Sequence, residues 1–584
     1  MKRYWKYIRP YIQYYILGPC FMMMEVVGDV LLPYMLAKII NQGIAERNVV
    51  YIIKIGVIMG FIAVIMAVGG VLGAWFASKA AMNFGADLRM DLFEKIQQFS
   101  FQNIDNFSTG SLITRLTNDI TQIQNMIMMT LRMCLRSPGI LIGAMVMAFV
   151  ISPKLAAIFI IVLPVLAVLI VVIMRRAFPQ FRTLQEKLDA LNSCIQEGLV
   201  GIRLIKSFVR GDYEEMRFEK RNQQLKEANL TAMKTMLLYT PLMTLALNIT
   251  TVVVVWSGGN MIVAGNMQVG DLTAFTNYIV QIMSSLTMLS IAFLNWARAI
   301  ASFRRVGEVL NEKIDLTDEN AKHKDRAVCE GSVEFQNVSF RYYKNSPEWV
   351  IENISFKLEA GKTLGIIGPT GSGKSTLVSM IPRLYDTDEG TVLVDGINVR
   401  DYGLKPLREG IGMVLQNNTL FSGSITENLK WGDEHADEKA VRKAAQNAQA
   451  AGFIDSFKDG YRTRLEQSGN NVSGGQKQRL CIARALLKCT KILILDDSTS
   501  AVDTATERAI REALHSEYKD MTKIIIAQRI SSVKDADRII VFDDGKIDGV
   551  GTHEELLENN SIYREVYNQQ MNDNADFDKK GGEQ

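Results

Sequence analysis

The sequence lacks the features that mark secreted disulfide scaffolds and general nucleic-acid binders. Its six cysteines show no C-x-x-C spacing and no paired arrangement, so we expect reduced thiols and a cytosolic setting for the soluble part of the chain. Its 65 Lys and Arg residues nearly balance 62 Asp and Glu residues, and the net charge of only +3 gives no reason to expect a nucleic-acid partner. The sequence also has no short-period repeat.

We also expect no cleavable export signal. The first apolar stretch, from about Tyr14 to Ile40, is too long for the roughly 7–15-residue core of a signal peptide, and no small-residue cleavage pattern follows it. The chain is 48% hydrophobic, and nearly all of its long apolar runs lie before about Arg304. Since a spanning helix needs about 20 mostly apolar residues, we predict six spans in contact with membrane lipid: Tyr14–Ile40, Tyr51–Ser78, Arg132–Ile151, Leu155–Met174, Thr235–Trp256 and Leu272–Ala299.

The distribution of basic residues predicts the orientation of these spans. Twelve Lys and Arg residues lie in 175–234 and five in 79–132, whereas the opposite short loops carry only Arg47 and Lys154. By the positive-inside rule, both termini and the soluble domain face the cytoplasm. We therefore expect a multi-pass protein of the cytoplasmic (inner) membrane of a bacterium.

The two cytoplasmic connections are much longer than turns and have a helical pattern, so spans two to five are expected to continue beyond the bilayer. Near the far point of each lies a short break rich in cap- and turn-forming residues, at 106–112 and at 210–215. A helix cap is the simpler explanation of each break. We also expect both breaks to serve as coupling elements that dock on the soluble domain.

The chain divides into domains by composition. We predict an all-α, six-helix membrane domain at 1–310 and a polar linker at 311–332. From Val333 the pattern changes to short β-rich segments, which predicts an α/β nucleotide-binding domain at 333–571 with an antiparallel β part and a helical part. The polar, glycine-containing tail at 572–584 is expected to be disordered.

A complete phosphate-binding loop follows the strand predicted at Thr363–Ile367. The run Gly368-Pro369-Thr370-Gly371-Ser372-Gly373-Lys374-Ser375, followed by Thr376, matches G-x-x-x-x-G-K-[ST] in the required strand–loop–helix context. The glycines let backbone N–H groups point at phosphate oxygens, and the helix N-terminus adds partial positive charge. Lys374 is expected to reach the outer phosphates of ATP, and Ser375 to offer its hydroxyl to Mg²⁺.

Two further polar side chains belong with this loop. The apolar strand Ile492–Asp496 ends in a carboxylate that is expected to hold Mg²⁺ directly or through water. Gln416, after the strand-like segment Ile411–Leu415, is a candidate additional contact to the metal and to the attacking water. ATP and Mg²⁺ are therefore the expected ligands.

Two more motifs complete a pattern. Val472-Ser473-Gly474-Gly475-Gln476 stands ahead of the Ile492 strand, and Ser500-Ala501-Val502-Asp503 follows it. Together with the phosphate loop and Gln416, they closely resemble the nucleotide-binding domain of ABC transporters, and the whole chain resembles an exporter-type half-transporter. The resemblance implies that Ser473, Gly474, Gly475 and Gln476 clasp the γ-phosphate of ATP on the opposite subunit, and that Asp503 belongs to the adjoining D-loop. It also implies that Tyr342 stacks on adenine, with the adjacent Tyr343 as an alternative.

Two positions depart from the pattern of that family. Asp497 stands where a glutamate acts as general base for the attacking water, and Gln528 stands where a histidine senses the γ-phosphate. An aspartate withdraws the carboxylate by about 1 Å, and loss of a general base typically costs about 10²–10⁴-fold in rate. A glutamine hydrogen-bonds to phosphate but carries no ionisable proton. We expect a site that binds ATP and hydrolyses it slowly.

An intact signature motif beside an impaired catalytic position resembles the degenerate-site subunit of heterodimeric bacterial multidrug exporters. This implies a heterodimer with a second half-transporter rather than a homodimer, export of amphipathic drugs or lipid-like small molecules, and ATP hydrolysis mainly at the partner's site. The alternatives are a regulatory, non-hydrolytic ATP-binding subunit and an importer built on the same fold.

Two acidic residues fall inside the first predicted span. Glu25 and Asp29 are four residues apart and therefore lie on one helical face. Ionisable groups at that depth usually face a cavity or a partner. They are candidates for recognising cationic substrates, and a polar contact between helices is the alternative.

Overall fold

The computed structural model describes residues 2–344 and 346–570, which form two compact units. One unit comprises the chain up to Gln97 together with Thr109–Asn311, and the other comprises Gln98–Ser108 together with the chain from Glu312 onward. The short segment Gln98–Ser108 thus leaves the helical unit and folds with the other one. The predicted tail at 572–584 lies outside the described residues.

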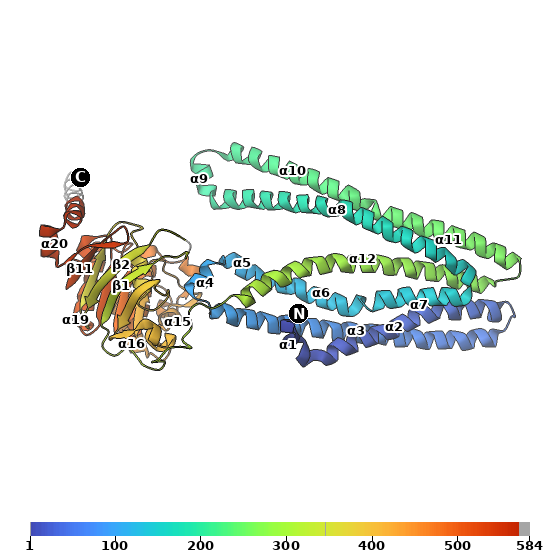
Figure 1. Ribbon diagram of the computed structural model, residues 1–584, viewed down its shortest axis with the longest axis horizontal. Helices are drawn as coiled ribbons and strands as arrows, with labels where there is room; N and C mark the ends of the chain where they lie inside the picture. Colours follow the sequence, from blue (N-terminus) through green and yellow to red (C-terminus); the bar gives the residue numbers. More distant parts are fainter. Residues whose placement is uncertain (1, 345, 571–584) are drawn as a thin grey trace. The chain divides into compact units, whose positions relative to one another are not determined.

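The first unit is a bundle of long helices (Figure 1). Helical turns at Lys2–Tyr4 (η1) and Arg9–Tyr11 (η2) flank the first helix, and π-helical turns at Ile39–Ile44 (η3) and Arg115–Asp119 (η4) extend two others. The helices are α1 (Trp5–Ile8), α2 (Ile12–Lys38), α3 (Val49–Gln97), α5 (Thr109–Thr114), α6 (Ile120–Met133), α7 (Arg136–Ile151), α8 (Pro153–Val200), α9 (Ile202–Ser207), α10 (Gly211–Leu237), α11 (Tyr239–Val263) and α12 (Val269–Asn311).

Five helical runs among the described residues are long and apolar enough to cross a membrane: Trp5–Ile44, Val49–Gln97, Thr109–Ile151, Pro153–Val200 and Gly211–Val263. Each of the first five predicted spans falls within one of them. The sixth predicted span, Leu272–Ala299, lies within α12. The 49 residues of α3 correspond to about 74 Å of helix at a rise of about 1.5 Å per residue, against a hydrocarbon core of about 30 Å. A helix of this length exceeds what is needed to cross the hydrocarbon core, which is compatible with the predicted continuation of the spans beyond the bilayer.

The breaks in the two long connections lie earlier in the chain than predicted. The first holds the short helix α4 (Phe101–Asp105), and the predicted range 106–112 contains only the following turn and the start of α5. The second holds α9, and the predicted range 210–215 lies almost entirely in the first turns of α10. A capping box explains the first shift: the Ser100 hydroxyl accepts from the Asn103 N–H at 3.1 Å, and the Asn103 side chain accepts from the Ser100 N–H at 3.3 Å.

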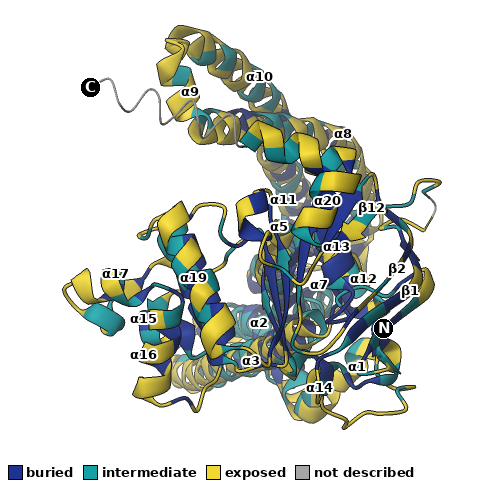
Figure 2. Ribbon diagram, turned by 90° about the vertical axis from the view of Figure 1, so that its left-hand side faces the viewer, coloured by how far each residue is buried: buried dark blue, intermediate teal, exposed yellow. Residues whose placement is uncertain are grey.

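The helices of the first unit pack unevenly. α12 packs against α2, α6 and α7, and α2 packs against α3, whereas α8 packs chiefly on α10. At the end that carries α9, the α8–α10 pair diverges from the other helices (Figure 1). Among the described residues, α10 buries only Ala232 and α9 buries none, and Figure 2 shows both with largely exposed faces. This two-helix arm keeps most of its surface accessible.

The second unit is built on β-sheets. An antiparallel sheet has the order β2-β1-β4-β5, a six-stranded and mostly parallel sheet has the order β12-β11-β3-β10-β9-β6, and β7 pairs with β8. The strands are β1 (Val333–Phe340), β2 (Ile351–Leu358), β3 (Thr363–Ile367), β4 (Glu389–Val394), β5 (Ile397–Asn398), β6 (Ile411–Val414), β7 (Gly423–Ser424), β8 (Arg464–Leu465), β9 (Ile492–Asp496), β10 (Thr522–Ile526), β11 (Arg538–Asp543) and β12 (Lys546–Gly551).

Helices cover these sheets and form a helical part around α18. They are α13 (Lys374–Ser379), α14 (Leu404–Glu409), α15 (Ile425–Leu429), α16 (Glu438–Asn447), α17 (Ala451–Ser456), α18 (Gly474–Leu487), α19 (Thr504–Glu517) and α20 (His553–Asn559), and residues 561–570 are also helical. α15 and α16 pack on α18, which begins at the signature motif. Figure 2 shows the outer faces of α16 and α19 exposed. The predicted fold class, a helical membrane domain followed by an α/β nucleotide-binding domain, is confirmed.

The central sheet brings three strand ends to one edge. β3, β10 and β9 are parallel neighbours in which Ile526 pairs with both Ile366 and Asp496. β9 is buried along its whole length, as expected for a strand that is covered on both faces of a parallel sheet. Because parallel strands end at the same edge, the loops that follow these three strands meet there.

Much of the segment predicted as a linker, 311–332, packs on the second unit. The Asp395 carboxylate accepts the N–H groups of the four successive residues Cys329–Ser332 at 2.7–3.0 Å, and Val328 is buried in the core beside the antiparallel sheet. The second unit therefore begins ahead of β1 and not at Val333.

Candidate nucleotide-binding site

The phosphate-binding loop joins β3 to α13 through a backbone that needs glycine. α13 begins at Lys374, as predicted. Gly371 and Gly373 have φ of +87° and +98°, a region that L side chains rarely adopt. A Cβ on Gly373 would also lie 2.8 Å from the Val350 carbonyl oxygen. The loop thus holds a tight curl immediately before the positive end of a helix, the arrangement that suits a bound phosphate.

The loop opens onto a cavity of about 290 Å³. It is lined by residues from the ends of β3, β9 and β10 and by three residues near β1, β2 and β6: Tyr342, Val350, Thr370, Gly371, Gly373, Lys374, Ser375, Thr376, Gln416, Asp496, Asp497, Ile526 and Gln528. The Lys374 ammonium donates to the Gly368 and Pro369 carbonyls at 2.8 and 2.5 Å and to the Ser372 hydroxyl at 3.3 Å. Burial lowers the pKa of Lys374, and Asp496 opposes that shift. A buried ammonium that faces only neutral loop oxygens at hydrogen-bond distance fits the phosphate chain of a nucleotide.

Beside the loop, a hydroxyl and a carboxylate are held together. The Ser375 hydroxyl donates to Asp496 Oδ1 at 2.9 Å. Asp496 is buried at the end of β9, and burial raises its pKa while the hydrogen bond from Ser375 lowers it. Mg²⁺ is usually held by one or two carboxylates together with waters and phosphate oxygens. Ser375, Asp496 and the cavity-lining Gln416 fit that ligand set, so the structure brings the predicted metal residues together.

The two departures from the family pattern are in direct contact. Asp497 follows β9 with φ of +46°, and its N–H donates to the Ile526 carbonyl at 3.0 Å. The Gln528 side-chain amide donates to Asp497 Oδ2 at 2.9 Å. Burial raises the pKa of Asp497, and the hydrogen bond from Gln528 opposes the shift. One carboxylate oxygen of the residue at the general-base position is therefore occupied by an amide that cannot take up its proton.

An aromatic side chain closes one side of the cavity. The Tyr342 hydroxyl hydrogen-bonds with Thr376 Oγ1 at 2.8 Å, which places its ring beside the helix of the phosphate loop. Tyr343 is 76% exposed and is not among the lining residues. The geometry favours Tyr342 for stacking on the base.

The same aromatic cluster reaches the inserted helix α4. The Tyr342 and Tyr385 rings meet edge-on with centroids 5.3 Å apart. Tyr385 also packs edge-on against Phe101 at 5.9 Å and donates to Asp105 Oδ2 at 2.9 Å. Burial together with Asp105 raises the pKa of the Tyr385 phenol. A chain of contacts therefore connects α4 with the nucleotide cavity inside one folded unit.

The signature motif and the D-loop begin two helices. Ser473 caps α18: its hydroxyl accepts the Gln476 N–H at 3.3 Å, and Gln476 Oε1 accepts the Ser473 N–H at 2.9 Å. Asp503 caps α19 by accepting the Thr506 N–H at 2.9 Å, which lowers the Asp503 pKa. Among the described residues that line the cavity, none comes from Ser473–Gln476. The signature motif of this chain lies apart from its own phosphate loop.

A buried glutamine that sequence reasoning missed links these elements. The Gln478 amide donates to Ser500 Oγ at 3.1 Å and accepts the Ala501 N–H at 3.0 Å. Ser500 Oγ in turn donates to the Asp497 carbonyl at 3.0 Å. Gln478 lies two residues after the signature motif, and a glutamine there gives no chemical signal in the sequence. Only the fold identifies it as the residue that connects α18 with the general-base position.

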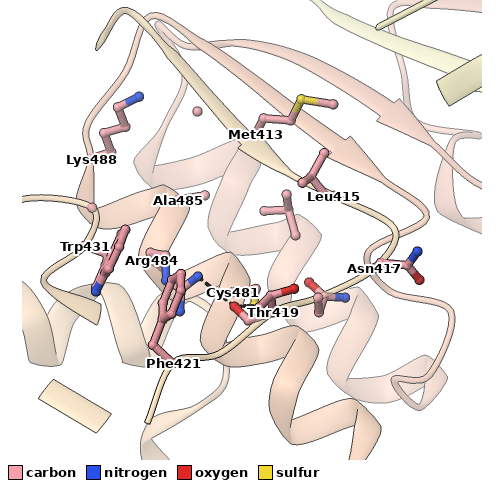
Figure 3. A pocket seen from close by; sticks show the side chains of 14 residues that line it. Met413, Leu415, Asn417, Thr419, Phe421, Trp431, Cys481, Arg484, Ala485 and Lys488 are labelled. Atoms are coloured by element: carbon pink, nitrogen blue, oxygen red, sulfur yellow. Dashed lines mark hydrogen bonds between the residues drawn. The ribbon is translucent and has the colours of Figure 1, made fainter. Parts of the chain in front are cut away.

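A second cavity of the same unit, about 310 Å³ in volume, is lined by β6, the loop after it and α18 (Figure 3). Phe421 and Trp431 stack there with centroids 4.2 Å apart, although they are 44% and 64% exposed. Arg484 supports the floor by donating to the Thr419 and Asn428 carbonyls at 3.0 and 2.9 Å. The sequence did not reveal this groove, whose rim carries the exposed aromatic side chains of Phe421 and Trp431.

In the first unit, the two acidic residues of α2 share a basic partner. Arg136 at the start of α7 donates to Glu25 Oε1 at 2.8 Å and to Asp29 Oδ2 at 3.4 Å. All three side chains are between 22% and 27% exposed. Sequence analysis did not pair Arg136 with them, because it lies more than a hundred residues away. Two carboxylates facing one guanidinium leave a formal excess of one negative charge.

Comparison with known proteins agrees with this architecture. Residues 15–286 match the family model of the ABC transporter transmembrane region, and residues 351–500 match that of the ABC transporter domain. The ABC transporter ATP-binding protein YfiB of Bacillus subtilis (strain 168) is 38% identical over 98% of this chain and 99% of its own length. The putative multidrug export ATP-binding/permease protein YgaD of the same organism is 33% identical over 97% and 98%.

A solved structure shares the fold. A bacterial Atm1-family ABC exporter with ATP bound superimposes with a TM-score of 0.80 over 96% of this chain and 98% of its own, at 23% identity. The present chain therefore belongs to the ABC transporter family. It is an exporter-type half-transporter in fold, in which a multi-pass membrane domain precedes an ATPase domain on one polypeptide.

Proposed function

We propose that this chain is one half of a heterodimeric ABC exporter, whose own ATP site holds nucleotide and hydrolyses it slowly while its signature motif completes the partner's catalytic site. ATP binding closes the two ATPase domains, the coupling elements in the two long connections transmit this closure to the membrane helices, and the pathway turns outward. Hydrolysis at the partner's phosphate loop resets the transporter. The observation that carries the proposal is the Asp497–Gln528 contact beside a complete set of ATP- and Mg²⁺-binding residues.

The geometry at Asp497 supports slow hydrolysis. The site fits a nucleotide because Lys374, Ser375 and Asp496 lie together at the phosphate loop. A general base needs a free carboxylate oxygen within reach of the attacking water. Asp497 has the shorter side chain, one of its oxygens accepts from Gln528, and its raised pKa reduces the ionised fraction at acidic pH. Binding and hydrolysis are thus separable in this site.

The position of the signature motif supports a shared site. Ser473–Gln476 forms an ordinary capped helix start that does not line this chain's cavity, so its phosphate-binding role requires a second ATPase domain. A homodimer would contain two copies of the impaired site. A partner with Glu and His at the corresponding positions would give one fast and one slow site.

The exposed α8–α10 arm supports a second subunit as well. α10 has 27 residues and buries a single one among those described, so packing within its own chain contributes little to its stability. At its end, α9 and the following turn expose the apolar side chains Leu204, Phe208 and Val209 at 62%, 69% and 89%. We assign this apolar end to the aromatic groove of Figure 3 on the partner's ATPase domain, and the corresponding end of the partner to the groove of this chain.

This docking has a direct test. A cysteine introduced by Leu204→Cys in this chain should form a disulfide, under mild oxidation, with a cysteine placed in the partner at the position that corresponds to Trp431. Lys220→Cys on the exposed middle of α10 should form none with the same partner cysteine. Cross-linking restricted to single chains would contradict the assignment.

The transported molecule is proposed to be an amphipathic or lipid-like compound with a positive charge. The formal excess of one negative charge at Glu25, Asp29 and Arg136 supports a cation in the pathway, since isolated charges in a membrane are costly and pair with counter-charges. Glu25→Gln should then reduce transport of a cationic dye but not of a neutral one. Equal loss of both would favour a purely structural contact between α2 and α7.

The proposed location is the cytoplasmic membrane of a bacterium, with both termini and the ATPase domain in the cytoplasm. The excess of Lys and Arg in the two long connections supports this orientation. Uptake of substrate into inside-out vesicles on addition of Mg-ATP would establish export. ATP-driven loss of substrate from the same vesicles would instead establish import on this fold.

The decisive experiment separates the proposal from a regulatory, non-hydrolytic subunit. The chain is purified alone and together with a candidate partner half-transporter that carries Glu and His at the two corresponding positions. The proposal requires Mg-ATP binding by the chain alone, little ATPase activity alone and high activity of the pair. It also requires Ser473→Ala in this chain to abolish most of the activity of the pair. If that activity survives, the chain acts only as a regulator.

A further inference from the structure

The C-terminal helix reaches the loop that carries Gln528. Residues 561–570 are helical, and Tyr563 is buried in a cluster that also contains Ala527 and Ile530. Ile562, Val566 and Tyr567 pack against the same cluster. The helix is therefore anchored by its apolar face directly behind the segment from Ala527 to Ile530, and its position is fixed relative to that loop.

The last described residue of this helix makes a two-sided contact with the loop. The Gln570 side-chain amide donates to the Gln528 carbonyl at 2.8 Å, and its Oε1 accepts the Ile530 N–H at 2.9 Å. Between these two points lies only Arg529. The Gln570 side chain therefore pairs with the backbone of residues 528–530 through one donated and one accepted hydrogen bond, as a neighbouring strand would. This segment lies beyond the end of β10, where no strand among the described residues holds it.

The side chain of Gln528 is the next link. It donates to Asp497 Oδ2 at 2.9 Å and lines the cavity together with Lys374. A long side chain is placed by its backbone, so the orientation of the Gln528 amide depends on what holds the Gln528 carbonyl and the Ile530 N–H two residues later. In the described structure Gln570 holds both.

We infer that Gln570 is a positioning residue that sets the Gln528–Asp497 pair at the end of the nucleotide's phosphate chain, so that the C-terminal helix controls how the site distinguishes ATP from ADP. The inference rests on ATP occupying this cavity with its γ-phosphate near Gln528. It requires neither a heterodimer nor a direction of transport. Gln570 touches no nucleotide and acts through the loop alone.

The neighbouring residue provides a matched control. Gln569 has the same side chain on the same helix and is exposed. Replacing either glutamine by alanine removes the same atoms and has the same effect on helix propensity, but only Gln570→Ala breaks the two contacts. Gln570→Glu is a graded variant: an ionised carboxylate still accepts from Ile530 but cannot donate to the Gln528 carbonyl, whereas a protonated one can do both.

The first measurement is nucleotide affinity of the full-length chain in detergent, with fluorescent Mg-ATP and Mg-ADP analogues as probes. Gln570→Ala should weaken ATP binding by about three- to tenfold, the equivalent of one or two neutral hydrogen bonds, and leave ADP binding unchanged. Gln569→Ala should change neither. Gln528→Ala should give the same selective loss, and the double variant Gln528→Ala/Gln570→Ala should lose no more than either single variant.

The second measurement needs no nucleotide. Amide hydrogen exchange in the peptide that covers 527–533 should be faster in Gln570→Ala than in wild type or Gln569→Ala, because Ile530 N–H loses its acceptor. Gln570→Glu should retain slow exchange at Ile530, and its ATP affinity should recover as the pH is lowered from about 7 towards about 5, where the carboxyl begins to protonate.

The outcomes distinguish this inference from the proposed function. If wild-type protein binds no Mg-ATP, both fall together. If wild type binds ATP and Gln570→Ala weakens ATP and ADP equally, the helix is merely structural and the positioning role is wrong. Additive losses in the double variant would also overturn it, since they would mean that Gln570 acts by a route other than Gln528.

Discussion

The substitution of Asp497 by glutamate tests the catalytic part of the argument most directly. Asp497→Glu adds one methylene, which advances the carboxylate by about 1 Å, and Gln528→His replaces an amide that cannot ionise by an imidazole that can. In the described structure the Gln528 amide donates to the Asp497 carboxylate at 2.9 Å. The longer side chain must therefore release or rearrange this contact, and the double variant should respond more than the sum of the two single variants.

The expected magnitude follows from what the site lacks. A displacement of about 1 Å can cost about 10²-fold in rate, and a general base contributes about 10²–10⁴-fold. The signature motif of this chain is intact, so two copies of the variant that associate in the assay would complete each other's sites. We expect the kcat for ATP hydrolysis of the purified chain to rise about tenfold with Asp497→Glu and about 10²-fold with Gln528→His added, while the affinity for Mg-ATP changes little.

Phosphate release from the detergent-solubilised chain at saturating Mg-ATP is the assay. Asp520→Glu, an Asp-to-Glu change in an exposed turn, is the matched control and should leave kcat unchanged. The reasoning would be refuted by wild-type protein that already hydrolyses ATP rapidly without a partner. It would equally be refuted if the double variant stayed as slow as wild type despite normal ATP binding.

Three further predictions follow from the described contacts. Gly373→Ala should abolish most ATP-analogue binding, whereas Gly371→Ala should weaken it by only about tenfold, because both have positive φ but only Gly373 has a carbonyl oxygen where its Cβ would lie. Since burial lowers the pKa of Lys374, its ammonium loses its proton at a lower pH than an ordinary lysine. Mg-ATP affinity should therefore fall as pH rises from about 7 to about 10; a constant affinity over that range would contradict this. Asp395→Ala should lower the free energy of unfolding of the ATPase unit by about 2–4 kcal/mol, measured by thermal unfolding, and the exposed Asp325→Ala should not.

The ATP site was predictable because its signals are local. The strand, the glycines and the lysine of the phosphate loop are contiguous in sequence, and β3, β9 and the start of α13 lie where the pattern placed them. Long apolar runs predicted the membrane helices for the same reason. Asp497 and Gln528 were found as deviations from a known order of motifs, and their contact follows from the parallel pairing of β9 with β10.

The contacts that could not be predicted join residues that lie far apart in the sequence. Arg136 meets Glu25 and Gln570 meets Gln528 across 111 and 42 residues, and neither residue type is informative alone. The position of α4 was missed for a different reason, since its capping box uses Asn103 where the usual signal is Glu or Gln. The groove beside Phe421 exists only once α18 lies against β6.

The insertion of α4 into the ATPase unit affects how this protein can be divided for study. A fragment cut at Glu312 would leave Tyr385 without the ring of Phe101 and the carboxylate of Asp105, on a side chain that also touches Tyr342. Such a fragment would present a new aromatic surface next to its nucleotide cavity and would be prone to aggregate or to misreport affinity. Supplying residues 98–108 as a separate peptide, or joining them through a flexible tether, would restore the missing surface of the isolated catalytic domain.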